Sequence, residues 1–241
     1  MNRMVLAQQL RNEAPAAGAA ISLAGVEAVC DPSGALFLPA FDLLCVSDLH
    51  LEKGAAFARR RQLLPPYDTA ATLDLLEAAL ARRNPAIFVS LGDSFHDRAG
   101  SGHLPLPYRE RLKGLMRGRQ WIWITGNHDP DGVEGLEGET CEDVSFGPLT
   151  FRHEPKAGQA RGEVAGHLHP AAAVTRREKT VRRPCFATDG ERLVMPSFGV
   201  LTGGLDLSHR AFDGLFDRQN LVAHLLHGGR VYTVPATRLK G

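Results

Sequence analysis

The sequence lacks the features that would place a protein in a membrane or in an oxidising compartment. No uninterrupted run of about 18 apolar residues occurs, so no transmembrane helix is predicted. The 4 cysteines form no C-x-x-C pair, which favours free thiols in a reducing compartment, and we expect a cytoplasmic protein. The formal net charge is +1, so no global electrostatic field favours a nucleic acid or a membrane surface.

The composition is that of an ordinary soluble protein with a sizeable core, because 44% of the residues are hydrophobic and 23% are charged. Residues 1–20 are rich in alanine, and we expect them to form a loosely ordered N-terminal extension. Candidate metal ligands recur from Asp48 to His169, and a domain boundary between them would split the site. We therefore predict a single domain over residues 21–241.

The most informative segment is the apolar run 87–91 and the polar residues that follow it. Asn84 and Pro85 precede the run and Gly92 follows it, as expected for a short strand buried on both faces. Asp93 comes directly after Gly92, at the strand end where α/β sheets usually bind ligands.

The same arrangement of an apolar run followed by polar side chains occurs four more times. Each motif alone is common, but five in order predict one shared site. The runs and the residues after them are 43–47 with Asp48 and His50, 121–125 with Asn127 and His128, 149–151 with His153, and 164–165 with His167 and His169.

The segments between these runs indicate the fold class. Amphipathic helices are predicted over residues 69–83 and 108–117, so the first half alternates strands with helices and favours a partly parallel sheet. Turn sequences at residues 31–34 and 189–190 predict hairpins, and the second half is richer in antiparallel pairing. The segments 98–107 and 131–139 are predicted loops.

The polar groups favour a centre with two metal ions. Imidazole and oxygen ligands without thiolate suit manganese, iron, zinc, nickel or cobalt. Eight such groups exceed the needs of one ion, whereas two ions sharing a carboxylate can clamp the oxygens of an in-line displacement at phosphorus. A water between two such ions loses a proton near neutral pH and becomes the nucleophile.

These motifs resemble those of the calcineurin-like metallophosphoesterase superfamily. The resemblance is carried by D-x-H at 48–50, G-D at 92–93, G-N-H-D at 126–129, His153 and G-H-x-H at 166–169. The segments S-D-L-H-L-E-K-G at 47–54 and P-S-F-G-V-L-T-G-G-L-D at 196–206 are similar to the DNA-ligase-associated, ICC-like branch. The resemblance implies an α/β fold, a four-layer αββα sandwich of two mixed sheets.

The resemblance also implies a role for each residue of the site. Asp93 would bridge two divalent ions, with manganese expected first, and His128 would contact the substrate phosphate and help the leaving group. His96 and Asp97 would support the ligands or His128 without binding metal. Asp48, His50 and His169 would hold one ion, and Asn127, His153 and His167 the other.

The activity implied by the resemblance is that of a metal-dependent phosphodiesterase, a DNA endonuclease in DNA repair, functionally associated with a DNA ligase and a helicase. Two alternatives stay open, a hydrolase of small cyclic or nucleotide phosphodiesters and a non-catalytic protein-binding scaffold. Basic clusters can form a solvated face or contact nucleic-acid phosphates. Their candidate residues are Arg59, Arg60, Arg61, Arg176, Arg177, Arg182 and Arg183.

Overall fold

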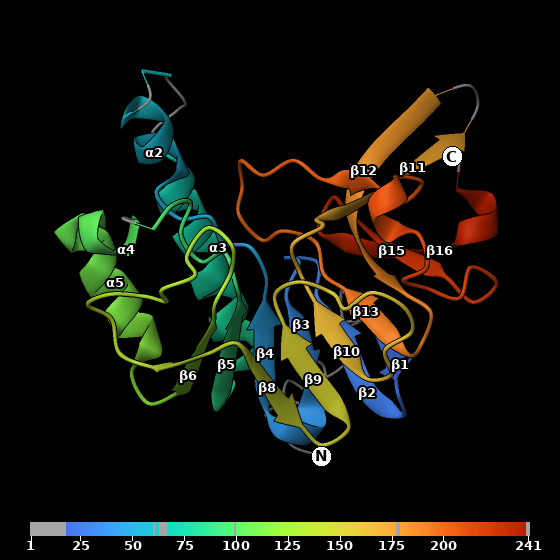
Figure 1. Ribbon diagram of the computed structural model, residues 1–241, viewed down its shortest axis with the longest axis horizontal. Helices are drawn as coiled ribbons and strands as arrows, with labels where there is room; N and C mark the ends of the chain where they lie inside the picture. The colour runs from blue at the N-terminus through green and yellow to red at the C-terminus, as the bar shows by residue number, and fades with distance from the viewer. Residues whose placement is uncertain (1–17, 60, 63–66, 99, 177–178, 240–241) are drawn as a thin grey trace, which may run out of the picture.

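Two β-sheets packed face to face form the centre of the molecule, and α-helices cover the outer face of the first sheet (Figure 1). The structure is a computed structural model that describes residues 18–59, 61–62, 67–98, 100–176 and 179–239. The predicted class of two mixed sheets with helices is confirmed.

The first sheet has seven strands, hydrogen-bonded in chain order. The first four pair antiparallel, and the fourth to the seventh pair parallel. The strands are β1 (Ala19–Leu23), β2 (Val26–Cys30), β3 (Leu36–Leu38), β4 (Leu43–Val46), β5 (Ile87–Leu91), β6 (Gln120–Ile124) and β7 (Glu139–Cys141).

The helices follow the parallel strands and pack on one face of this sheet. Leu73, Leu76 and Leu80 of the longest helix are buried in a cluster with Phe88 and Trp121 of the sheet, as its apolar stripe predicts. The helices are α2 (Lys53–Arg59), α3 (Asp68–Arg83), α4 (Gly100–His103) and α5 (Leu106–Met116), and a 3-10 turn, η1 (Pro39–Phe41), precedes β4.

The second sheet has nine strands and is mostly antiparallel. Parallel pairs join β10 to β9 and β13, and β11 to β14. The strands are β8 (Asp143–Phe146), β9 (Leu149–Arg152), β10 (Glu163–Ala165), β11 (Pro170–Arg176), β12 (Lys179–Thr188), β13 (Arg192–Val194), β14 (Leu205–Asp206), β15 (Val222–His227) and β16 (Arg230–Pro235).

The fourth layer differs in detail from the predicted sandwich. In the described part of the chain no α-helix follows Met116. The outer face of the second sheet is covered instead by the segment 207–221, which includes the 3-10 turn η2 (Arg210–Phe212). Phe212, Leu215 and Phe216 of that segment pack against Ala172 and Cys185 of the sheet, so short turns suffice to bury this face.

Ala24 and Gly25 take left-handed φ values of 48° and 86° and make the tight turn that joins β1 to β2. Two local expectations need correction. The first strand begins at Ala19, inside the predicted extension, whereas residues 1–17 lie outside the described residues. The predicted loop 98–107 contains α4 and the start of α5.

The topology brings the polar strand ends together. β4, β5 and β6 are parallel neighbours, so the residues after them emerge at one edge of the first sheet. β9 and β10 are likewise parallel neighbours in the second sheet. None of the helices within the described ranges is both long and apolar enough to cross a membrane.

Candidate active site

The predicted ligands converge where the two sheets meet. The Asp48 carboxylate accepts the main-chain N–H of His167 at 3.1 Å, which joins the segment after β4 to the segment after β10. The main-chain N–H of His50 donates to the carbonyl of Asp93 at 2.9 Å. The side chain of His153, which follows β9, reaches Asn127, which follows β6. All seven predicted metal ligands therefore lie in one constellation.

The backbone of this constellation is unusually strained. Five of the predicted ligands have left-handed φ angles, a region in which residues with a Cβ rarely lie. Each such residue costs about 1–3 kcal/mol, so the fold stabilises conformations that the local sequence disfavours. Their φ values are 54° for Asp48, 45° for His50, 47° for Asp93, 66° for His167 and 45° for His169.

Two motif glycines allow the site loops to approach each other. A Cβ on Gly92, which has a φ of 74°, would overlap the ring of His153. A Cβ on Gly126 would overlap the carboxylate and the main-chain nitrogen of Asp93. Glycine is therefore required at these positions by close packing of the site.

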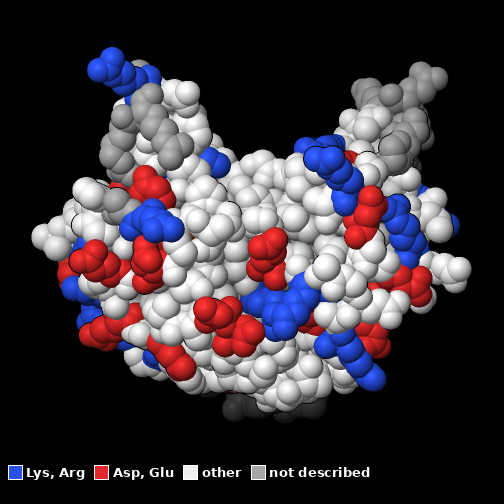
Figure 2. Space-filling view, viewed as in Figure 1, with Lys and Arg blue, Asp and Glu red and all other residues white. Residues whose placement is uncertain are grey.

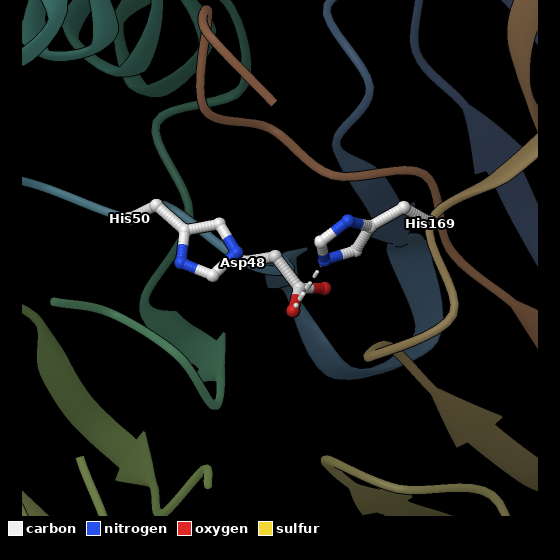
Figure 3. Close-up of side chains that lie close together, drawn as sticks. All are labelled: Asp48, His50 and His169. Atoms are coloured by element: carbon white, nitrogen blue, oxygen red, sulfur yellow. Dashed lines mark ion pairs between the residues drawn. The ribbon is translucent and has the colours of Figure 1, made fainter. Parts of the chain in front are cut away.

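The first group of ligands consists of Asp48, His50 and His169 (Figure 3). The imidazole rings of His50 and His169 lie on either side of the Asp48 carboxylate, and His169 Nε2 is 3.0 Å from Asp48 Oδ1. Asp48 is fully buried, and its Oδ2 is held by the hydroxyl of Ser47 and the main-chain N–H of His167. Its remaining oxygen therefore points at the two rings.

Three buried atoms of this group are incompletely satisfied by the described residues. His50 Nδ1 makes no hydrogen bond there, and Asp48 Oδ1 and His169 Nε2 contact each other at 3.0 Å without a further hydrogen bond. Buried polar atoms are rarely left without a partner, because the lost hydration costs about 1–3 kcal/mol for each group. A divalent cation would satisfy such oxygen and nitrogen atoms, so the residues present fit a metal ion.

The second group consists of Asp93, His153 and His167, with Asn127 beside them. His153 Nδ1 donates to the main-chain oxygen of Leu91 at 3.0 Å, which leaves Nε2 as the ligand atom. That Nε2 lies 2.9 Å from Asn127 Oδ1 and 3.4 Å from Asp93 Oδ2. One nitrogen and two oxygens thus face a common point, as ligands of a cation do.

Asp93 connects the two groups. Possible ligand atoms of His50, Asp93 and His128 form a third group, and within each group all atoms lie within 4.8 Å of one another. His50 therefore links Asp93 to the first group, and Asp93 also belongs to the second. The Asp93 carboxylate thus lies within reach of ligand atoms from both groups.

The electrostatics of the apo site also fit bound cations. Burial would lower the pKa of His153, but the hydrogen bond with Asp93 and the charge of Asp48 raise that pKa to about 9. Burial would raise the pKa of Asp93, but contacts with His153 lower it to about 2. Burial lowers the pKa of His50 to about 3 despite the two nearby carboxylates. Two ionised aspartates favour cations here, and a metal ion bound at His153 would replace the proton that this imidazole otherwise holds.

His128 faces the same site but is held for a different task. Its Nδ1 donates to the main-chain oxygen of His96 at 2.8 Å, and its ring stacks on the ring of His96 with centroids 5.1 Å apart. Its Nε2 lies 3.9 Å from Asp93 Oδ2 and its side chain is 39% exposed. His96 is therefore placed as a neighbour of His128. The carbonyl of Asp97 accepts the main-chain N–H of Gly100, at the start of α4.

Asp129 is a site residue to which sequence reasoning gave no role. Its carboxylate is 3% exposed and accepts four main-chain N–H groups, those of Asp93, Ser94, Phe95 and Gly126, at 2.8–3.2 Å. These bonds tie the loop after β5 to the loop after β6. Burial nevertheless raises the pKa of this carboxyl to about 6. The position of Asp129 in the G-N-H-D motif was the only available signal.

An open cleft leads to these residues. A cavity of about 330 Å³ is lined by His50, His128 and His169, by Lys53 of α2, and by the turn 202–204. A second cavity of about 170 Å³ adjoins it and is lined by Arg182 and Arg183. Sequence reasoning missed the contribution of Lys53 to this cleft.

The other predicted basic contacts are described only in part. Arg61 is exposed. The structure does not describe Arg60 and Arg177, nor the side chains of Arg59 and Arg176.

Comparisons with known proteins agree with this geometry. The family model of the calcineurin-like phosphoesterases matches residues 41–182, more than half of the chain. The crystal structure of the nuclease MPE of Pseudomonas putida is similar, with a TM-score of 0.70 and 26% sequence identity over 90% of this chain and 100% of that chain. YfcE, a phosphoesterase of E. coli, has a TM-score of 0.38 and 18% identity over 80% of this chain and 98% of that chain. No curated protein matches the sequence.

The family model covers both aspartates and all four imidazoles of the two ligand groups, the residues whose geometry suits divalent cations. The sequence-based prediction of the superfamily is therefore confirmed. The chain belongs to the calcineurin-like phosphoesterase family and is a metal-dependent phosphoesterase.

Proposed function

We propose that this chain is a phosphodiesterase that cleaves DNA internally, with two manganese ions as its cofactors. The observation that carries the proposal is the position of Asp93, between one ligand group centred on Asp48 and another centred on His153. Two adjacent cations suit displacement at a phosphodiester, because both the attacking and the leaving oxygen need stabilisation.

The predicted ligands divide between the two ions as the groups indicate. Asp48, His50 and His169 would hold one ion, and Asn127, His153 and His167 the other, with Asp93 shared. When bound, the ions would lower the pKa of a coordinated water and neutralise charge on the phosphate oxygens. The carbonyl of Leu91 and the hydroxyl of Ser47 keep His153 and Asp48 oriented toward these positions.

His128 would act on the substrate. Its Nδ1–H donates to the carbonyl of His96, so Nε2 is the ring nitrogen that can contact a phosphate oxygen at the cleft. In its protonated form that nitrogen can donate a hydrogen bond to a phosphoryl oxygen that carries negative charge, or a proton to the leaving oxygen. The stacked ring of His96 limits rotation of His128 and keeps it in this orientation.

Two observations favour a nucleic acid over a small diester. The similar solved structure from Pseudomonas putida is named a nuclease. The cavity beside the cleft carries Arg182 and Arg183, and basic side chains stand on both arms that flank the hollow in the surface (Figure 2). A polyanionic strand would gain binding affinity from contacts with several of these basic side chains, whereas a small diester would contact only the side chains nearest the cleft.

The cellular setting follows from the resemblance of the sequence motifs to the DNA-ligase-associated branch. We propose a role in DNA repair in the cytoplasm, in functional association with a DNA ligase and a helicase.

Cleavage and binding of single-stranded DNA test the proposed function. In the presence of Mn²⁺ the protein should cut a labelled single strand internally, and the logarithm of its affinity should fall linearly with the logarithm of the salt concentration. Binding is measured with Ca²⁺ in place of Mn²⁺, so that the DNA is bound without being cleaved. An affinity for DNA that does not depend on salt, or faster hydrolysis of cyclic nucleotides than of DNA, would contradict the proposed DNA substrate. A small phosphodiester would then be the better candidate.

A further inference from the structure

The turn formed by Thr202, Gly203 and Gly204 borders both cavities at the active site. It lines the cleft that holds His128, and it also lines the neighbouring cavity that holds Arg182 and Arg183. His169, a predicted metal ligand, lines both cavities as well. The turn is therefore next to the metal site, although nothing in the mechanism above uses it.

Two cations from different parts of the fold hold this turn. The Lys53 ammonium, at the start of α2, donates to the carbonyl of Leu201 at 2.9 Å. The Arg182 guanidinium, from β12, donates to the carbonyl of Gly204 and also pairs with Asp206 at 3.7 Å. α2 and β12 lie in the two arms of the molecule (Figure 1), and these arms stand on opposite sides of the hollow (Figure 2), so the turn is held from both sides.

The turn carries hydrogen-bond donors that the protein does not use. Within the described residues, the main-chain N–H groups of Gly203 and Gly204 donate no hydrogen bond. Thr202 Oγ1 is buried and has no hydrogen-bond partner there. A Cβ added to Gly203 would meet nothing within 4 Å, so this side of the turn is open. Successive free N–H groups beside cations are a usual binding site for an anion.

The Lys53 ammonium makes its hydrogen bond with this turn and not with the aspartates of the ligand groups. Among the described residues, no ion pair within 4.0 Å joins Lys53 to Asp48 or Asp93. The ammonium is directed at the turn, and it has three N–H donors of which Leu201 takes one. A phosphate at the turn would therefore lie beside the metal-bound phosphate of the same strand.

We propose that Thr202–Gly204, together with Lys53 and Arg182, binds the phosphate next to the one that is hydrolysed. This inference rests on the proposed function and narrows the substrate to a chain with at least two consecutive phosphodiesters. Asp206 neutralises part of the Arg182 charge, and the charge of Asp68 acts on Lys53, so the two cations share the positive charge of this subsite.

The test compares a substrate with one phosphate and a substrate with many. For a labelled single strand of DNA, Lys53→Met should raise KM about tenfold and reduce the salt slope of binding by about one, with little change in kcat. For bis(p-nitrophenyl) phosphate, which has a single phosphate, KM should rise much less. Thr202→Val, which removes the hydroxyl, should also raise the KM for DNA. Thr202→Ser, which keeps the hydroxyl, should have the wild-type KM.

Lys113→Met is the matched control, because Lys113 is exposed on α5 and pairs with Glu110. If Lys53→Met leaves the KM for DNA unchanged while the wild type cleaves DNA, this inference fails and the proposed function stands. An equal loss of kcat/KM on both substrates would also overturn it, because Lys53 would then act on the hydrolysed phosphate. If the wild type cleaves no DNA, both proposals fail.

Discussion

Asp93→Ala should abolish hydrolysis of a chromogenic phosphodiester, with kcat reduced by at least about 10³-fold, because both metal positions depend on this carboxylate. Asp93 is shared by two of the ligand groups, and its Oδ1 also accepts the main-chain N–H of His128 at 2.9 Å. Its removal should therefore weaken the binding of both proposed ions and release the main chain of His128. Metal analysis of the purified variant should find no more than one ion where the wild type holds two.

The matched control is Asp213→Ala, which removes an exposed carboxylate that pairs only with Arg218 at the surface. It should keep wild-type activity and metal content. An Asp93→Ala protein that retained full metal content and a tenth or more of the wild-type kcat would show that the two ions do not share this residue. Circular dichroism separates loss of activity from loss of folding.

Asp129→Asn should reduce kcat about 100-fold although this side chain faces away from the substrate. An amide keeps one acceptor oxygen and replaces the other with an NH₂ group, so some of the four main-chain N–H donors would face another donor. Each donor left unpaired costs about 1–3 kcal/mol of stability. The loop that carries Asp93 would also shift, and a misplacement of about 1 Å can cost 10²-fold in rate.

A positioning role differs from a purely structural one in its effect on metal binding. Affinity for Mn²⁺ should fall about 10- to 100-fold in Asp129→Asn, and high Mn²⁺ should restore part of the activity. Asp131→Asn makes the same change at an exposed residue two positions away and should have no such effect. Unaltered kcat and metal affinity in Asp129→Asn would contradict the role assigned to these hydrogen bonds.

Much of the site was predictable because parallel strands deliver their following residues to one edge of a sheet. The polar residues after β4, β5 and β6 meet for this reason, so the strand pattern alone predicts that Asp48, Asp93 and Asn127 lie together. The helix α3 was also predicted to within one residue of both ends, since its caps and apolar stripe are local features.

The remainder depends on contacts between residues far apart in the sequence. The left-handed backbone of His50 or His169 has no local signal, because such conformations persist only where the surrounding structure imposes them. Lys53 meets Leu201 across 148 positions of sequence, and Asp129 supports the loop after β5 from the loop after β6. Pattern reasoning finds ligands that follow strands, but it does not find the residues that hold the loops.

Hydrolysis of bis(p-nitrophenyl) phosphate and p-nitrophenyl phosphate, with and without Mn²⁺, tests the central claim most directly. Metal-stripped protein should be inactive, and added Mn²⁺ should restore cleavage of the diester with little or no cleavage of the monoester. Preference for the monoester would identify a phosphatase. Absence of hydrolysis with any divalent ion would contradict the account of the two ligand groups as a catalytic centre.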